Sequence, residues 1–146
     1  MKIVAWPVDT VTQATTGSPI TLGDDSAGCY VVGGQPRVIP AKPQIEDLAF
    51  SATIFRAARG NAETRVEWEV SREHASIAVA FAFEWDHGAA VPGYCHLQFI
   101  EGTTKRYLAF AVLTSADESE PRNKSTKFRY VAVGGLATGT APSGVS

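Results

Sequence analysis

The sequence has no long apolar run, no large excess of charge of either sign and only two cysteines. Because nothing in it approaches about 18 consecutive apolar residues, we expect no membrane-spanning helix. The 13 Lys and Arg residues against 15 Asp and Glu give a formal net charge of −2, so no global field attracts nucleic acid or an anionic membrane. The start of the chain, MKIVAWPVDT, is too short and too polar for the apolar core of a signal peptide. We therefore expect a soluble protein that is made in a cytosol.

The two cysteines, Cys29 and Cys95, are too few for a disulfide framework. Without a secretory signal, we expect both of them to be reduced, partly buried thiols. A bridge between two sheets is the alternative, if the two residues meet in the fold.

Sequence motifs of catalysis and cofactor binding are missing as well. No G-x-S-x-G nucleophile elbow occurs, and the glycine pairs at 33–34 and 134–135 lack the downstream lysine of a phosphate loop. Adjacent carboxylates at 24–25, 46–47 and 117–118 differ from the two carboxyls, held across a cleft, that glycoside hydrolysis requires. We expect neither an enzyme nor a cofactor.

The three histidines, at 74, 87 and 96, are the remaining candidates for a metal site. The best local set of zinc ligands is Asp86, His87, Cys95 and His96, and its spacing matches no zinc finger. His96 follows Cys95 on an alternating strand, so their side chains point to opposite faces unless a bulge intervenes. We predict surface or turn histidines and no metal site.

Period-two alternation is the strongest pattern in the chain, and it predicts a fold made of strands. The clearest case is 64–71, where apolar and polar residues alternate. A second alternating strand is expected at 48–54 and a hairpin from about 94 to 113. Residues 76–85 have large apolar side chains at every second position from 77, with alanines at 78, 80 and 82 between them, which favours a central strand covered on both faces.

Other segments are shorter or less regular. Further short strands are predicted at 2–5, 19–22, 29–32 and 127–132. The polar residues 114–126 are expected to form an exposed loop, and residues 86–93 a turn. The last residues, GGLATGTAPSGVS at 134–146, are rich in Gly, Ser and Thr, which is typical of a flexible tail or of one that orders against a partner.

Together these patterns predict one all-β domain over residues 1–133, followed by the tail at 134–146. Many short strands without a convincing amphipathic helix indicate an antiparallel sandwich or barrel. Of these we choose an immunoglobulin-like β-sandwich. The Gly-, Pro- and Thr-rich residues 1–43 are either its first strands or an extended N-terminal arm.

Four segments between residues 47 and 113 resemble the immunoglobulin-like β-sandwich domains of tailed-phage virion proteins, which occur in tails, baseplates and head fibres. The segments are LAFSATIF, TRVEWEV, VPGYCHLQF and KRYLAFAVL. The resemblance implies a structural protein of the virion, such as a decoration, adaptor, collar or tail-associated subunit. It also implies homo-oligomeric contacts, other virion proteins as partners, and a place in the virion after synthesis in the host cytoplasm.

Four residues in segments expected to be exposed are predicted to form such interfaces: Trp6, Arg122, Lys124 and Leu136. The basic cluster around residues 122–129 directly follows three acidic residues. This compensation of charge favours the polar rim of a protein contact over a nucleic-acid surface.

The alternative function is a carbohydrate- or ligand-binding module, because tryptophans can stack on sugar rings. Trp68 and Trp85 continue apolar faces, so we expect both of them in the core. Trp6, beside Pro7 in the N-terminal segment, is the tryptophan expected to be exposed.

Overall fold

The computed structural model describes residues 1–39, 43–50, 53–61, 64–134 and 136–146, with backbone alone within 43–61 and at 136–137. These residues are mostly in strands. The strands are β1 (Lys2–Pro7), β2 (Ile20–Asp24), β3 (Cys29–Val31), β4 (Arg37–Ile39), β5 (Pro43–Phe50), β6 (Thr53–Asn61), β7 (Arg65–Glu73), β8 (Tyr94–Glu101), β9 (Thr104–Asp117), β10 (Ser125–Val133) and β11 (Leu136–Thr138). The helices are α1 (Ile77–Ala90) and two short 3-10 helices, η1 (Asp25–Ala27) and η2 (Pro121–Asn123). Among the described residues, no helix is both long and apolar enough to cross a membrane.

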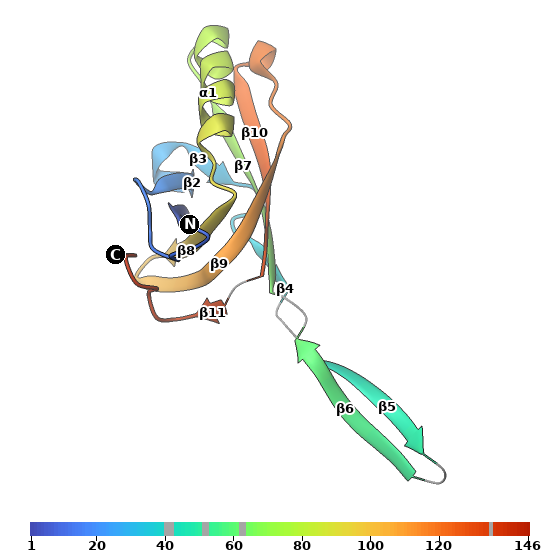
Figure 1. Ribbon diagram of the computed structural model, residues 1–146. Helices are drawn as coiled ribbons and strands as arrows, with labels where there is room; N and C mark the ends of the chain where they lie inside the picture. Colours follow the sequence, from blue (N-terminus) through green and yellow to red (C-terminus); the bar gives the residue numbers. More distant parts are fainter. Residues whose placement is uncertain (40–42, 51–52, 62–63, 135) are drawn as a thin grey trace.

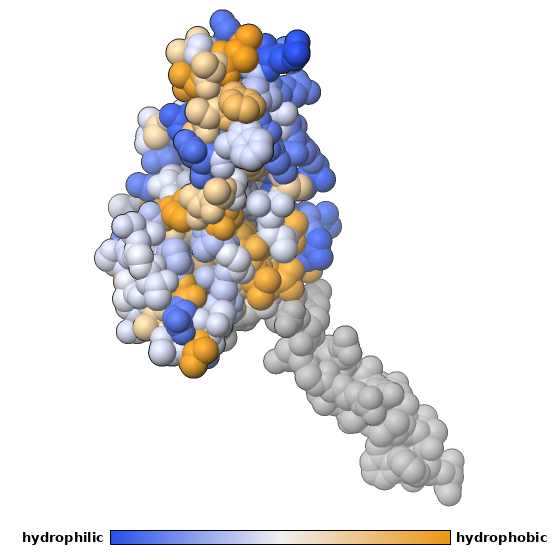
Figure 2. All heavy atoms as spheres, turned by 45° about the horizontal axis from the view of Figure 1, so that its top comes forward, coloured by the Kyte–Doolittle hydropathy of each residue, from blue (hydrophilic) through white to orange (hydrophobic). Residues whose placement is uncertain are grey.

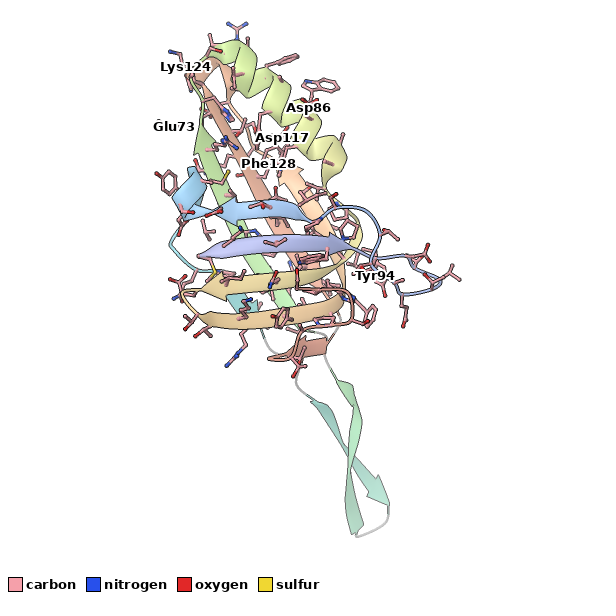
Figure 3. All side chains as sticks on the ribbon, turned by 90° about the vertical axis from the view of Figure 1, so that its left-hand side faces the viewer. Glu73, Asp86, Tyr94, Asp117, Lys124 and Phe128 are labelled. Atoms are coloured by element: carbon pink, nitrogen blue, oxygen red, sulfur yellow. The ribbon has the colours of Figure 1, made fainter. Side chains whose placement is uncertain are left out.

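Seven strands form a closed antiparallel barrel (Figure 1). Their order is β10-β7-β3-β2-β1-β8-β9, and the pairing of β9 with β10 closes the ring. β4 pairs with β7, and β11 pairs with β9. Figure 3 shows β2, β1, β8 and β9 crossing over β7 and β10, so the barrel has two layers of crossing strands. The predicted all-β, antiparallel class is thereby confirmed.

The long strand β9 takes part in both layers. It pairs with β8 through residues 104–112 and with β10 through residues 112–117. Phe110 has a φ of 56°, in the left-handed region that non-glycine residues rarely adopt. The register of β8 and β9 shifts between Cys95 and Leu97. Such a bulge bends a strand and increases its twist, which lets β9 change neighbours.

Alternating side chains fill the barrel. On β7, the apolar residues Val66, Trp68 and Val70 are buried, as the alternation at 64–71 predicts. Trp68 stacks on Tyr130 at a centroid distance of 5.3 Å and meets Phe99 edge-on at 5.7 Å. Each large apolar side chain buried in this way stabilises the fold by roughly 1.5–3 kcal/mol.

Several predicted elements are confirmed. The hairpin expected at 94–113 consists of β8 and β9, and the short early strands are β1, β2 and β3. The last predicted strand is β10. The polar segment 114–126 is only partly a loop, because β9 continues to Asp117 and η2 precedes the start of β10.

The strand predicted at 76–85 is wrong, because Ser76 caps α1 and residues 77–85 belong to this helix. The Oγ of Ser76 accepts a hydrogen bond from the Val79 N–H at 3.2 Å, and such a cap stabilises a helix start. Alanine, the best helix former, occupies every second position from 78 to 82. The turn predicted at 86–93 is correspondingly shortened, since the helix continues to Ala90.

The single strand predicted at 48–54 is also wrong. Its residues divide between β5 and β6, which pair antiparallel as a separate two-stranded sheet. Ala52, which was expected on the apolar face of that strand, lies outside the described residues. Figure 1 shows this pair of strands extending away from the barrel.

The C-terminal residues are held against the barrel at two places. β11 pairs with β9 through residues 136–138. The main-chain oxygen of Ser146 accepts a hydrogen bond from Gln98 Nε2 at 3.0 Å. The glycine-rich end was predicted to be a flexible tail, but it contacts the barrel at these two places.

Candidate protein interface

Helix α1 presents an apolar surface to solvent. Its sequence, IAVAFAFEWDHGAA, is apolar almost all round, which is typical of a helix that is buried on every side. Only one side is covered here, where Ala80 is buried and Phe83 and His87 are half-buried. The large exposed side chains are Ile77, Val79, Phe81 and Trp85, at 51%, 50%, 56% and 69%. Figure 2 shows hydrophobic residues gathered at this end of the molecule.

The side of α1 farthest from the barrel carries no charged residue. At 3.6 residues per turn, one stripe of the helix contains Ala78, Phe81, Ala82, Trp85 and Ala89, and all five are exposed. We call these five residues the α1 apolar face. The rings of Phe81 and Trp85 lie 6.2 Å apart. A contiguous apolar surface of this kind marks a site of contact with another molecule.

Acidic groups border the α1 apolar face along the second half of the helix. The side chain of Glu84 is hydrogen-bonded to that of Asp117 in β9, and this contact raises the pKa of Glu84. The two carboxyl groups and Trp85 line a shallow hollow of about 360 Å³. Asp86 is exposed nearby. This border is therefore acidic and includes two carboxyls in direct contact.

Charged groups of both signs lie at the beginning of the helix, since Glu73 and Glu120 are exposed there beside two basic residues. Arg122 in η2 and Lys124 directly after it are exposed, and η2 contacts α1. Figure 3 places Lys124 at the end where α1 begins, with Asp86 and Asp117 farther along the helix. Of the four residues predicted for interfaces, these two therefore lie near the start of α1.

The other two predicted interface residues lie away from the helix. Trp6, which was expected to be exposed, is half-buried on β1, and its Nε1 donates a hydrogen bond to Gln98 Oε1 at 3.2 Å. Leu136 is in β11, beside β9. The exposed tryptophan is Trp85, whose predicted place in the core is wrong because residue 85 lies on the outer side of a helix. Trp68 is buried, as predicted.

An aromatic layer fixes the covered side of α1 to the barrel. The Phe83 ring stacks on the His87 ring at 5.0 Å, and the guanidinium of Arg72 lies 4.9 Å from the centre of the Phe83 ring. His87 Nε2 and Tyr130 Oη are hydrogen-bonded at 2.5 Å. These contacts determine which side of an all-round apolar helix faces the solvent.

The prediction of surface or turn histidines is wrong for His87 and His96. His87 packs under α1, and His96 is only 1% exposed. The His96 Nδ1 accepts a hydrogen bond from the Phe110 N–H at 3.0 Å, and the Phe110 ring covers the imidazole at 4.5 Å. The bulge beside His96 brings this covering residue into place. Across the residues that the structure describes, no three or more His, Cys, Asp and Glu side chains are grouped to hold a metal ion.

Acidification is expected to loosen the packing of α1. Burial, with a smaller contribution from Arg72, lowers the pKa of both His87 and His74. The pKa of histidine in the unfolded chain is about 6.5, so the unfolded chain takes up protons at a higher pH than the folded protein does. The free energy of unfolding therefore has its full value above a pH of about 6.5 and decreases as the pH falls below it. Urea denaturation at a series of pH values measures this dependence. His87→Gln should reduce its slope, and a stability that does not change with pH in this window would contradict the prediction.

The two thiols are expected to differ in reactivity. Both cysteines are unpaired. Cys95 is fully buried, and burial raises its pKa to about 12. Cys29 is partly exposed, with its Sγ 3.5 Å from a guanidinium nitrogen of Arg72. A thiol reagent should therefore label Cys29 in the native protein and Cys95 only after unfolding. The control Cys29→Ser should remove the native labelling, and equal rates at both thiols would refute the prediction.

Comparison of the chain with protein-family models, curated proteins and solved structures found no significant match. The α1 apolar face is a candidate site of contact with another molecule.

Proposed function

We propose that this chain is a non-enzymatic structural subunit of a tailed-phage virion that acts through protein–protein interfaces. The observation that carries the assembly role is the α1 apolar face, since soluble monomers seldom leave such a surface uncovered. The proposed location in a virion, and the proposal that other virion proteins are its partners, are based on the resemblance of the segments between residues 47 and 113. A decoration, adaptor, collar or tail-associated subunit would each use such an interface.

The immunoglobulin-like class of the fold is part of the same proposal. In support, the hairpin of β8 and β9 contains one of the four segments that carry the resemblance, KRYLAFAVL, and most of a second, VPGYCHLQF. The separate pair of β5 and β6 gives further support to an assembly role (Figure 1). Extended strand pairs can add to the edge of a neighbouring subunit's sheet.

The test is the presence of the chain in purified particles of the phage that encodes it. Mass spectrometry of gradient-purified virions should detect the chain in a copy number that fits a symmetric assembly. Trp85→Gln should lower its incorporation. The control Tyr30→Gln alters an aromatic residue that is 59% exposed on β3, and it should leave incorporation unchanged. A chain that is abundant in the lysate and absent from the particles would overturn the proposal.

A carbohydrate- or ligand-binding module is the second candidate. It is favoured by the exposed pair Phe81 and Trp85, because an aromatic ring with an open face can stack on a sugar. Tryptophan fluorescence during titration with a panel of glycans is the measurement. A change in emission that Trp85→Phe removes would support this function, and emission that no glycan alters would exclude it.

A further inference from the structure

The α1 apolar face has the spacing of a helix-packing seam. Ala78, Ala82, Trp85 and Ala89 follow one another at intervals of four, three and four residues, which keeps side chains directed at a partner helix. The alanines allow two helix backbones to approach closely, while Trp85 and Phe81 supply ring area. A second helix therefore fits this face better than a flat sheet.

The charges around the face favour two copies in antiparallel orientation. Glu84 and Asp86 are in the second half of α1 and Asp117 lies beside Glu84, whereas Lys124 lies near the start of the helix (Figure 3) and Arg122 is in η2, which contacts α1. In an antiparallel pair about a two-fold axis, the carboxyl groups along the helix of each copy lie beside Arg122 and Lys124 of the other, where Glu73 and Glu120 are also exposed. In a parallel pair, the carboxyl groups along the two helices would meet one another. Opposed helix dipoles also favour the antiparallel pair.

Three of these charged groups form no salt bridge among the described residues. In the part of the chain that the structure describes, Asp86, Arg122 and Lys124 take part in no salt bridge. Glu84 contacts another carboxyl, that of Asp117. Two neighbouring carboxyl groups resist simultaneous ionisation, and a cation placed between them relieves this repulsion. A basic group from outside the chain would therefore be bound favourably here.

We infer that the occupant of the α1 apolar face is α1 of a second copy of this chain, packed antiparallel about a two-fold axis. Trp85 of each copy packs against Ala78 and Ala82 of the other, and Arg122 and Lys124 of each copy approach Glu84 and Asp117 of the other. The inference rests on the proposed assembly role and names its partner. A single pair of helices forms a small interface, below about 1,200 Å² in total, so dissociation on the order of micromolar concentrations is expected.

Sedimentation velocity across a concentration series tests the apolar part of this dimer. The wild-type protein should pass from monomer to dimer as its concentration rises. Trp85→Glu, and separately Phe81→Glu, should weaken the association by at least about tenfold, because each buries a charge in the interface. Tyr30→Glu is the matched control at an exposed aromatic residue outside α1 and should dimerise as the wild type does. Far-UV circular dichroism verifies that all variants are folded.

A charge exchange tests the antiparallel orientation. Glu84→Lys with Asp117→Lys makes both ends of the interface basic, and Arg122→Glu with Lys124→Glu makes both ends acidic. Each double variant alone should associate at least about tenfold more weakly than the wild type, and an equimolar mixture of the two should form a heterodimer. Raising the salt concentration should weaken that heterodimer.

The outcomes separate this inference from the proposed function. A wild-type chain that stays monomeric at every concentration overturns the second copy as occupant. A dimer that Trp85→Glu leaves intact, or a mixture that does not associate, overturns the arrangement. In each case, incorporation of the chain into virions is measured independently, and its loss in Trp85→Gln would then assign the α1 apolar face to a different virion protein.

Discussion

Tyr130→Ala is expected to lower the free energy of unfolding by about 3–5 kcal/mol. Tyr130 is fully buried, stacks on Trp68 and is hydrogen-bonded to His87. Its ring lies between the barrel core and the layer under α1, so truncation leaves a cavity at the junction of the two. Urea denaturation followed by circular dichroism gives the size of the loss.

The matched control is Tyr130→Phe, which keeps the ring and removes only the hydroxyl. The half-buried His87 then loses its partner, and we expect a cost of about 1–3 kcal/mol. The difference between the two variants measures the packing of the ring. Equal losses would show that the ring contributes little, contrary to its position in the core.

Gly144→Ala is expected to displace the C-terminal segment and to destabilise the protein by about 2–4 kcal/mol. Gly144 has a φ of 85°, where a side chain is strained. A Cβ there would also collide with Thr15 Oγ1 and lie 3.0 Å from Thr15 Cγ2. Displacement would remove the acceptor that Ser146 offers to the buried Gln98 amide. Denaturation measures the loss, and hydrogen exchange in β8 should rise with it.

Gly28→Ala provides the control for backbone strain. Gly28 has a φ of 80°, and a Cβ there would meet no atom within 4 Å. Only strain of about 1–2 kcal/mol is therefore expected, with no change of exchange in β8. If the two variants lost the same stability, the contact between Gly144 and Thr15 would have no energetic role.

Local periodicity predicts the barrel strands because one face of each strand is buried. The alternation at 64–71 gives the buried side of β7, and the alternation from 94 onward gives the hairpin of β8 and β9. The closure of the barrel could not be predicted in this way. It depends on Phe110, whose positive φ lets β9 reach β10, and no residue in that stretch is a typical bulge residue.

The helix was missed because its pattern fits two periods. Residues 77–85 alternate large and small apolar side chains, as a covered strand does, while Ser76 and the alanines favour a helix. Even when α1 is assigned as a helix, its sequence does not determine which side is exposed, because apolar side chains lie on every side of it. Distant residues such as Tyr130 and Arg72 decide that. Arg122 and Lys124 could be predicted as interface candidates because their exposure follows from a polar segment alone.

The position of α1 in the chain has a mechanical consequence. The helix joins β7 to β8, which are not neighbours in the barrel, and each of these strands is hydrogen-bonded on both sides. A force applied to the subunit through α1 is therefore transmitted to β7 and β8, two strands of different layers of the barrel. Neither strand can peel from an open edge, so each must break two ladders of hydrogen bonds before it leaves the sheet.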